Sequence, residues 1–289
     1  MTENALAKIK IVLAMLIFGT IGIVVKNISL PSSAIALSRA AIGSLFLCVL
    51  MLLTRKKFSF SALKNNLGVL LVSGALLGGN WVLLFEAYKY TSVSVATLCY
   101  YFAPIFVICL SPLLLKEKLN KLRILGVIVA IVGIAAVSGI FGGIGKLSAK
   151  GVLLGLSAAL FYAGVVMLNK KLVGMSSYEI TLTQLAVSFA VLTLYAVLTK
   201  DILAFESIDK SSLLWLISAG VIHTGIAYAL YFGAIKAVKA QSAAILGYVD
   251  PVVAIILSAI LLGERLGAIE IIGAILILGS TLMCELTDK

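Results

Sequence analysis

Long apolar runs, separated by short polar gaps, dominate the pattern of this chain of 289 residues. A transmembrane helix needs about 20 mostly apolar residues. Divided at charged breaks and at breaks rich in Gly, Ser or Asn, the chain contains ten runs of roughly this length: 9–26, 31–53, 66–88, 93–115, 122–141, 150–169, 177–199, 212–233, 239–262 and 267–285. The pattern predicts an all-α integral membrane protein with ten transmembrane helices, and the gaps are too short to hold a soluble domain.

Composition agrees with the pattern, since 62% of the residues are apolar and only 12% are charged. Soluble proteins are about half apolar and a quarter charged. The net charge of +11 would indicate nucleic acid as a partner of a soluble protein. Here the basic residues lie in the gaps between apolar runs, where they set orientation in a membrane. We therefore expect a lipid bilayer as partner and no nucleic acid, and we interpret the first run as a retained helix rather than a signal peptide.

The second half of the chain repeats residues of the first half at a constant offset of 147 positions. The recurring residues Phe85, Ala87, Lys89, Tyr101, Pro104, Glu117, Leu119 and Gly126 have as counterparts Phe232, Ala234, Lys236, Tyr248, Pro251, Glu264, Leu266 and Gly273. Five helices per half is an odd number, so the second half must be inverted relative to the first. The sequence thus predicts two inverted five-helix repeats, residues 1–145 and 146–289, an architecture of many secondary transporters.

Basic residues distribute unevenly between the two sides that this topology defines. With the N-terminus in the cytoplasm, 15 Lys and Arg lie inside and 7 outside, with Arg39 left within a span. The positive-inside rule favours this orientation. We expect a multi-pass protein of the cell membrane with both termini in the cytoplasm.

Two segments carry a family resemblance. AYKYTSVSVATLCYYFAPIFVICLSPLLLKEKL (87–119) and AIKAVKAQSAAILGYVDPVVAIILSAILLGERL (234–266), each followed by a Gly-bearing apolar helix, resemble the two halves of an EamA-type drug/metabolite transporter. The resemblance covers essentially the whole chain. It implies ten helices, a central cavity lined mainly by the first, third, fourth, sixth, eighth and ninth helices, and movement of small polar metabolites, commonly amino acids outward.

Asp250 is the leading candidate for a functional residue. It lies about 16 Å into the run 239–262, close to the middle of a bilayer. It could cap the second half of a helix broken at Pro251, or hold a substrate ammonium or a proton exchanged across the membrane. We favour the functional interpretation, because deep acids generally mark ion or substrate paths. Its repeat counterpart is Ala103.

Arg39 is the other costly charge within a span. It could be a structural lock, paired with carbonyl groups or with a carboxylate such as Glu86. It could also clamp a substrate carboxylate. The resemblance assigns the second helix to the periphery rather than to the cavity wall, so the structural interpretation is favoured.

Other polar and aromatic residues fall at similar depths. His223, the only histidine, is either a hydrogen-bonded core residue or a group that titrates near neutral pH. Aromatic side chains either pack or stack on a substrate amine by cation–π attraction. The predicted substrate-binding set is Asp250, Tyr101, Tyr248, Tyr228, Tyr231, Asn80, Trp81 and His223.

Gating or structural roles are expected for Glu117, Glu264, Pro104, Pro251 and Arg39. Glu117 and Glu264 end the fourth and ninth runs at opposite faces of the membrane. Each is either a solvated residue paired with a neighbouring base or part of a latch that opens and closes as access alternates.

Enzyme motifs are weak or missing. GYVD resembles the Gly-x-Gly-Asp of intramembrane aspartyl proteases, but Val249 replaces the second glycine and no second deep aspartate is present. Neither G-x-S-x-G nor H-E-x-x-H occurs. We expect no enzymatic activity, no metal and no cofactor.

The predicted function is secondary active transport of a small polar metabolite by alternating access, with export of an amino acid or related amine favoured. Uptake of an organic cation such as a choline-like amine, and a passive facilitator or channel, remain alternatives. The coupling ion, protons included, and the choice between monomer and homodimer stay open.

Overall fold

The computed structural model describes residues 3–55, 58–114, 121–138, 148–238, 240–264 and 266–286. In these ranges all regular structure is helical and no strand occurs. Seven helical stretches are long and apolar enough to cross a membrane: Asn4–Lys26, Ser32–Leu53, Phe60–Tyr90, Val93–Pro112, Ala149–Asn169, Ser177–Leu198 and Lys210–Ala234. Shorter apolar helices cover Ile245–Leu261 and Ala268–Cys284. The all-α class and the apolar helices of a membrane protein are thus confirmed.

Six helices run without interruption. They are α3 (Ser32–Leu53), α4 (Phe60–Tyr90), α7 (Lys121–Val137), α8 (Ala149–Asn169), α9 (Ser177–Leu198) and α14 (Ala268–Leu286). Serine side chains cap the N-terminal ends of α4, α8 and α9, each accepting a backbone N–H three residues on. These caps satisfy amide groups that have no partner inside the helix.

The other helices are interrupted. α1 (Glu3–Gly19) meets α2 (Ile21–Lys26) at Thr20, and α10 (Lys210–Gly220) continues through the π-helix η2 (Val221–Ile226) into α11 (Ala227–Ala234) and the short 3₁₀ helix η3 (Ile235–Ala237). α5 (Val93–Tyr100) is followed by α6 (Ala103–Leu114), and α12 (Ala240–Gly247) by α13 (Val249–Leu261). A further 3₁₀ helix, η1 (Asp201–Ser207), precedes α10.

The break expected at Pro251 lies three residues earlier, at Tyr248, between α12 and α13. Its counterpart at Tyr101 likewise precedes Pro104 by three residues. Each proline therefore falls in the first turn of a new helix, where a missing N–H costs little because those amides have no helical partner. The prolines start the second half-helices instead of bending continuous ones.

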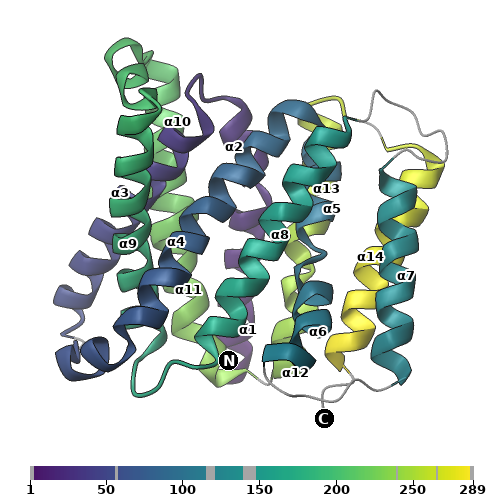
Figure 1. Cartoon of the computed structure of the whole chain (residues 1–289), viewed down its shortest axis with the longest axis horizontal. Helices are drawn as coiled ribbons and strands as arrows, with labels where there is room; N and C mark the ends of the chain where they lie inside the picture. Colours follow the sequence, from purple (N-terminus) through teal and green to yellow (C-terminus); the bar gives the residue numbers. More distant parts are fainter. Residues whose placement is uncertain are drawn as a thin grey trace.

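Figure 1 shows the helices running up and down side by side, with the start of α1 and the end of α14 at the same end of the molecule. We call this the lower end, and the opposite end, where α13 finishes and α3 and α5 begin, the upper end. α7 and α14 lie together at one side of the molecule (Figure 1). Their backbones touch, since a Cβ on Gly273 would lie 2.8 Å from the carbonyl oxygen of Gly133. Small residues permit such close approach in membranes.

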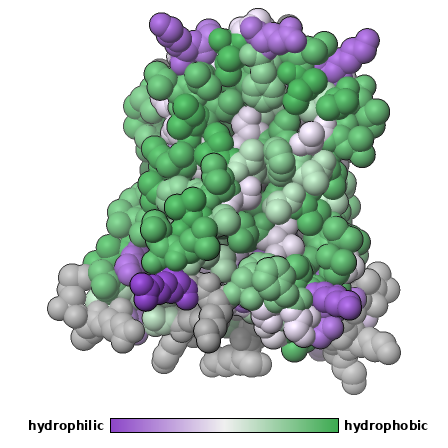
Figure 2. Space-filling model, turned by 90° about the vertical axis from the view of Figure 1, so that its left-hand side faces the viewer, coloured by the Kyte–Doolittle hydropathy of each residue, from purple (hydrophilic) through white to green (hydrophobic). Residues whose placement is uncertain are grey.

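The outer surface carries a broad apolar belt between polar ends (Figure 2). On the face formed by α3, α9 and α10, large exposed side chains include Leu45, Val49, Leu194, Val197, Leu214 and Ile217. Such a belt suits contact with lipid.

Asp209 immediately precedes α10 at the upper end. The Asp209 carboxylate accepts hydrogen bonds from the backbone N–H and the hydroxyl of Ser212, at 2.9 and 2.7 Å. These bonds hold the pKa of Asp209 below its ordinary value. Asp209 thus caps α10 outside the apolar part of the helix.

Candidate functional site

A cavity of about 830 Å³ lies among the helices. This volume suits a small metabolite. Its lining comes from α1, α4, α6, α8, α9, α11 and α12, with fewer residues from α2, α3, α5 and α13. The helices that the resemblance assigns to the cavity therefore form most of the wall, but α3 and α9, which correspond to the second and seventh predicted runs, also reach it.

Six of the eight predicted substrate-binding residues line the cavity: Trp81, Tyr101, Tyr228, Tyr231, Tyr248 and Asp250. Arg39 and Pro104, expected to be gating or structural, line it as well. Asn80 and His223 do not belong to the lining among the described residues.

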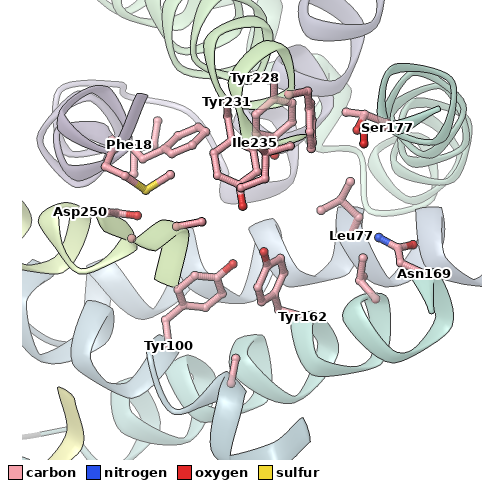
Figure 3. A pocket seen from close by; sticks show the side chains of 18 of the residues that line it. Phe18, Leu77, Tyr100, Tyr162, Asn169, Ser177, Tyr228, Tyr231, Ile235 and Asp250 are labelled. Atoms are coloured by element: carbon pink, nitrogen blue, oxygen red, sulfur yellow. The ribbon is translucent and has the colours of Figure 1, made fainter. Parts of the chain in front are cut away.

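Asp250 is the second residue of α13 and is half-buried at the cavity wall. The nearby Tyr101 hydroxyl donates to the Gly247 carbonyl of α12 at 3.4 Å. In the part of the chain that the structure describes, no backbone N–H donates to the Asp250 side chain and no basic residue pairs with it. Its carboxylate faces the cavity (Figure 3). The Asp250 carboxylate therefore faces the cavity and does not cap α13 among the described residues.

Tyrosines surround the space in front of Asp250. Figure 3 shows the hydroxyl groups of Tyr100, Tyr162 and Tyr231 converging there from different helices. The rings of Tyr100 and Tyr162 have centroids 5.5 Å apart, and Phe18 packs edge-on to Tyr228 at 5.6 Å. The Tyr248 hydroxyl instead donates to Thr281 of α14 at 2.6 Å. Aromatic faces and hydroxyl groups thus form much of the wall.

Sequence reasoning missed Phe18 and Tyr162 as site residues, and it placed the Tyr100 hydroxyl near the level of Asp250 without including it in the predicted substrate-binding set. The signal was present in LIFGTIGIVVKN and ALFYAGVVMLNK, two matching stretches in which Phe18 and Tyr162 sit one position apart. Tyr100 directly precedes the break before α6. A rule that helix breaks and their repeat partners face the cavity would have found them.

Arg39 is only 5% exposed, and its guanidinium borders the cavity. Its Nε donates to Thr224 Oγ1 at 3.0 Å. Its Cζ lies 4.2 Å from the ring centroid of Trp81 and 5.4 Å from that of Phe85. No carboxylate among the described residues lies within 4.0 Å of it.

The expected pairing of Arg39 with Glu86 does not occur. Glu86 Oε2 accepts from Ser32 at 2.7 Å and pairs with Lys89 at 3.0 Å. Ser32 starts α3 seven residues before Arg39, a rise of about 10 Å along a helix. Glu86 is therefore engaged near the upper end, while Arg39 lies about two turns deeper.

His223 and Asn80 join helices outside the cavity. His223 is 3% exposed, with Nε2 2.7 Å from Thr20 Oγ1 and Nδ1 3.2 Å from the Ser218 carbonyl. It links η2 to the junction of α1 and α2. Asn80 Nδ2 donates to the Ala158 carbonyl at 2.6 Å and connects α4 to α8. The side chains of both residues face neighbouring helices rather than the cavity.

Glu264 lies at the upper end beside three helices. Its Oε2 accepts from the backbone N–H of Val93 at 2.8 Å and from Ser258 at 2.9 Å, and its Oε1 lies 4.0 Å from Lys26 Nζ. It thereby connects α2, α5 and α13, which is more than a solvated residue paired with a neighbour. Its counterpart Glu117 lies outside the described residues.

The cavity reaches toward the lower end and is covered at the upper end. Asn169 at the end of α8, Ser177 at the start of α9 and Val238 after η3 line its lower part. At the upper end of the helices, Val25, Ile28, Ile35, Tyr88 and Val93 are all buried. Among the described residues, the lining of the cavity therefore extends toward the lower end, and buried side chains pack at the upper end.

Comparisons with known proteins show which family and which fold this chain resembles. The EamA-like transporter family matches residues 6–139 and 149–285. An uncharacterized transporter, YxxF, of Bacillus subtilis (strain 168) is 31% identical over 95% of this chain and 88% of its own length. The protein RarD of Escherichia coli (strain K12) is 25% identical over 82% of this chain and 79% of its own. A solved crystal structure, 20% identical, shares the fold with a TM-score of 0.65 over 97% of this chain and 96% of the other.

Proposed function

Because the chain belongs to the EamA-like transporter family, we propose that it is a secondary active transporter that moves an amino acid or a related amine-bearing metabolite across the cell membrane by alternating access. The observation that carries this proposal is the Asp250 carboxylate, which faces the cavity without a basic partner among the described residues. A carboxylate in a membrane interior is costly, and a substrate ammonium would offset that cost.

The aromatic wall supports an ammonium-bearing cargo. Tyr228, Tyr231 and Phe18 face the same space as Asp250 (Figure 3). Aromatic faces attract cations by about 0.5–2 kcal/mol each, more where water is excluded. Contact with these rings and with Asp250 would offset most of the hydration free energy that a cation loses when it leaves water.

We further propose ten transmembrane helices in two inverted repeats, residues 1–145 and 146–289. The two helix breaks that correspond in the repeat lie next to each other: the Tyr101 hydroxyl is 3.4 Å from the Gly247 carbonyl, and the rings of Tyr101 and Tyr248 have centroids 6.4 Å apart. Corresponding elements meet near the symmetry axis of such a repeat. This contact supports the inverted arrangement.

Export is the favoured direction. The start of α1 and the end of α14 share the lower end, and the excess of Lys and Arg favours the cytoplasm for that end. The cavity reaches the same end, so cargo would load from the cytoplasm. A gradient, for which a proton gradient is one candidate, would supply the energy.

Counterflow in proteoliposomes tests the role of Asp250. We expect Asp250→Asn to lower counterflow of a transported amino acid by about 100-fold, because losing one partner of a buried charge pair costs roughly 2–5 kcal/mol. Asp209→Asn is the matched control: it makes the same change at the upper end, and asparagine still caps a helix. Both variants should elute as folded protein in size-exclusion chromatography.

Wild-type rates of counterflow in Asp250→Asn would remove Asp250 from the mechanism. Transport that neither saturates nor supports counterflow in the wild type would instead favour a passive channel.

Uptake of an organic cation is the second candidate. The tyrosine wall together with one carboxylate also suits a quaternary amine. The two candidates differ in whether the cargo carries a carboxylate, and Arg39 bears on that difference.

A further inference from the structure

Arg39 has the surroundings of a ligand-binding cation rather than of a structural ion pair. Structural buried charges are normally paired with an opposite charge. Within the described ranges, Arg39 has a hydroxyl and two aromatic faces as neighbours but no carboxylate. These groups orient the guanidinium without neutralising it.

The contacts of Arg39 leave part of its donor set unused. Only Nε takes part in a hydrogen bond among the described residues, and its acceptor is Thr224. The face of the guanidinium lies over Trp81 at 4.2 Å. The two terminal amino groups thus remain for a ligand, and the side chain borders the cavity. A guanidinium presents its donors in a planar fork that matches a carboxylate.

The π-helix η2 places Thr224 against Arg39. Thr224 Oγ1 donates to the carbonyl of Ala219, five residues earlier, as expected where a helix widens by one residue. Its oxygen still accepts from Arg39 Nε. Single π turns occur frequently at functional sites. Here the wider turn holds the hydroxyl that fixes the plane of the guanidinium.

Arg39 and Asp250 belong to the same cavity. Both line it, as do Tyr100, Tyr101 and Tyr228. One cation and one anion therefore belong to the same space, which tyrosine side chains also line.

We propose that Arg39 binds the carboxylate of the cargo, so that the transporter selects zwitterionic amino acids over simple amines and organic cations. The inference rests on the proposed function, in which Asp250 receives the ammonium. A zwitterion satisfies both charges at once, whereas an amine without a carboxylate leaves Arg39 buried and unpaired. An analogue that leaves a buried polar group unpaired is rejected strongly.

Ligand binding to the purified wild-type protein tests this without any substitution. The standard L-amino acids are screened by thermal shift, and the tightest binder is compared with its C-terminal amide and its decarboxylated amine. Both analogues keep the ammonium and lack the carboxylate. We expect the amino acid to bind at least about tenfold more tightly than either analogue, a difference of about 1.4 kcal/mol.

The variant Arg39→Gln should bind the amino acid and its amide with equal affinity. Lys89→Gln is the matched control, because it removes a positive charge from the partly exposed end of α4, and it should keep the wild-type preference. If Arg39→Gln does not fold, Arg39→Lys keeps the charge without the planar fork. Its preference for the amino acid over the amide should be weaker than that of the wild type but should not vanish.

The outcomes separate the two proposals. Equal binding of the amino acid and its amide to the wild type would overturn the role of Arg39 and leave the amine site intact. Binding of amines alone would overturn it in favour of an organic-cation transporter. If no amine-bearing compound binds, both the proposed cargo class and this inference are wrong.

Discussion

His223 shows how a residue of suitable chemistry acquires a structural role. Its ring nitrogens both face protein groups, Thr20 on one side and the Ser218 carbonyl on the other, and the side chain is 3% exposed. Because a carbonyl can only accept, Nδ1 carries a proton. The ring therefore fastens the junction of α1 and α2 to the π-helix.

We predict that His223→Gln lowers thermal stability but leaves the pH dependence of transport between about pH 5 and 8 unchanged. Breaking a buried hydrogen bond costs about 1–3 kcal/mol. Thr20→Val removes the partner hydroxyl, and the double variant should lose less than the two single losses together, because contacting residues couple by about 0.5–3 kcal/mol. Thermal unfolding and transport rates across pH check this. A flattened pH profile in His223→Gln would make the imidazole a proton carrier.

At the scale of elements, the contact between α3 and η2 sets the position of Arg39. Glycines at this contact allow the helices to approach: a Cβ at Gly43 would meet Thr224, and a Cβ at Gly225 would lie 2.5 Å from the Phe46 ring. Close packing of small residues replaces the hydrophobic effect as a source of stability between helices in lipid. The same approach brings Thr224 within hydrogen-bonding distance of Arg39.

We predict that Gly43→Ala destabilises the protein by about 1–3 kcal/mol, the usual cost of overpacking, and weakens amino-acid binding because Thr224 must move. Gly68→Ala on α4 is the matched control. Its added Cβ would meet no atom within 4 Å, and alanine stabilises a helix by roughly 0.5–1 kcal/mol relative to glycine. Thermal unfolding in detergent measures both. Equal stability of the two variants would show that the α3–η2 contact tolerates widening.

At the scale of the molecule, polar contacts join several helices at the upper end. Glu264 connects α2, α5 and α13. Ser33 bonds to Asp201, and Ser29 N–H donates to Ser212 at 2.9 Å. These bonds hold together the helices that cover the upper end of the cavity. In the alternating-access cycle that we propose, these bonds would break in the opposite state.

We predict that the upper end opens more often in Glu264→Gln, because the negative charge of Glu264 strengthens its contacts with Val93, Ser258 and Lys26. A Val25→Cys reporter, placed on a background without native cysteines, measures this through its reaction with a water-soluble thiol reagent; Val25 is 6% exposed. We expect labelling about tenfold faster, equivalent to about 1.4 kcal/mol. Glu206→Gln, an exposed acid in η1 at the same end, should leave the rate unchanged. An unchanged rate in Glu264→Gln would show that other contacts hold the end closed.

The sequence by itself determined the features that depend on neighbours along the chain. Apolar runs specify helices in a membrane because no backbone group there can bond to water. The helix breaks are predictable from Pro104 and Pro251, since proline is favoured in the first turn of a helix, although Pro112 lies inside α6 without ending it. The depth of Asp250 follows from counting residues within its run. Most of the tyrosine wall could be predicted for the same reason.

Only the tertiary structure decided which polar side chains face the cavity. Successive residues of a helix point about 100° apart, so an error of one residue exchanges a cavity residue for a buried one. Asn80 and Trp81 are adjacent, yet only Trp81 lines the cavity. The π-helix η2 again changes the direction in which successive side chains point, at His223 and Thr224. Arg39 reaches the cavity and Glu86 does not reach Arg39, because helix packing, rather than local sequence, fixes the distances between helices.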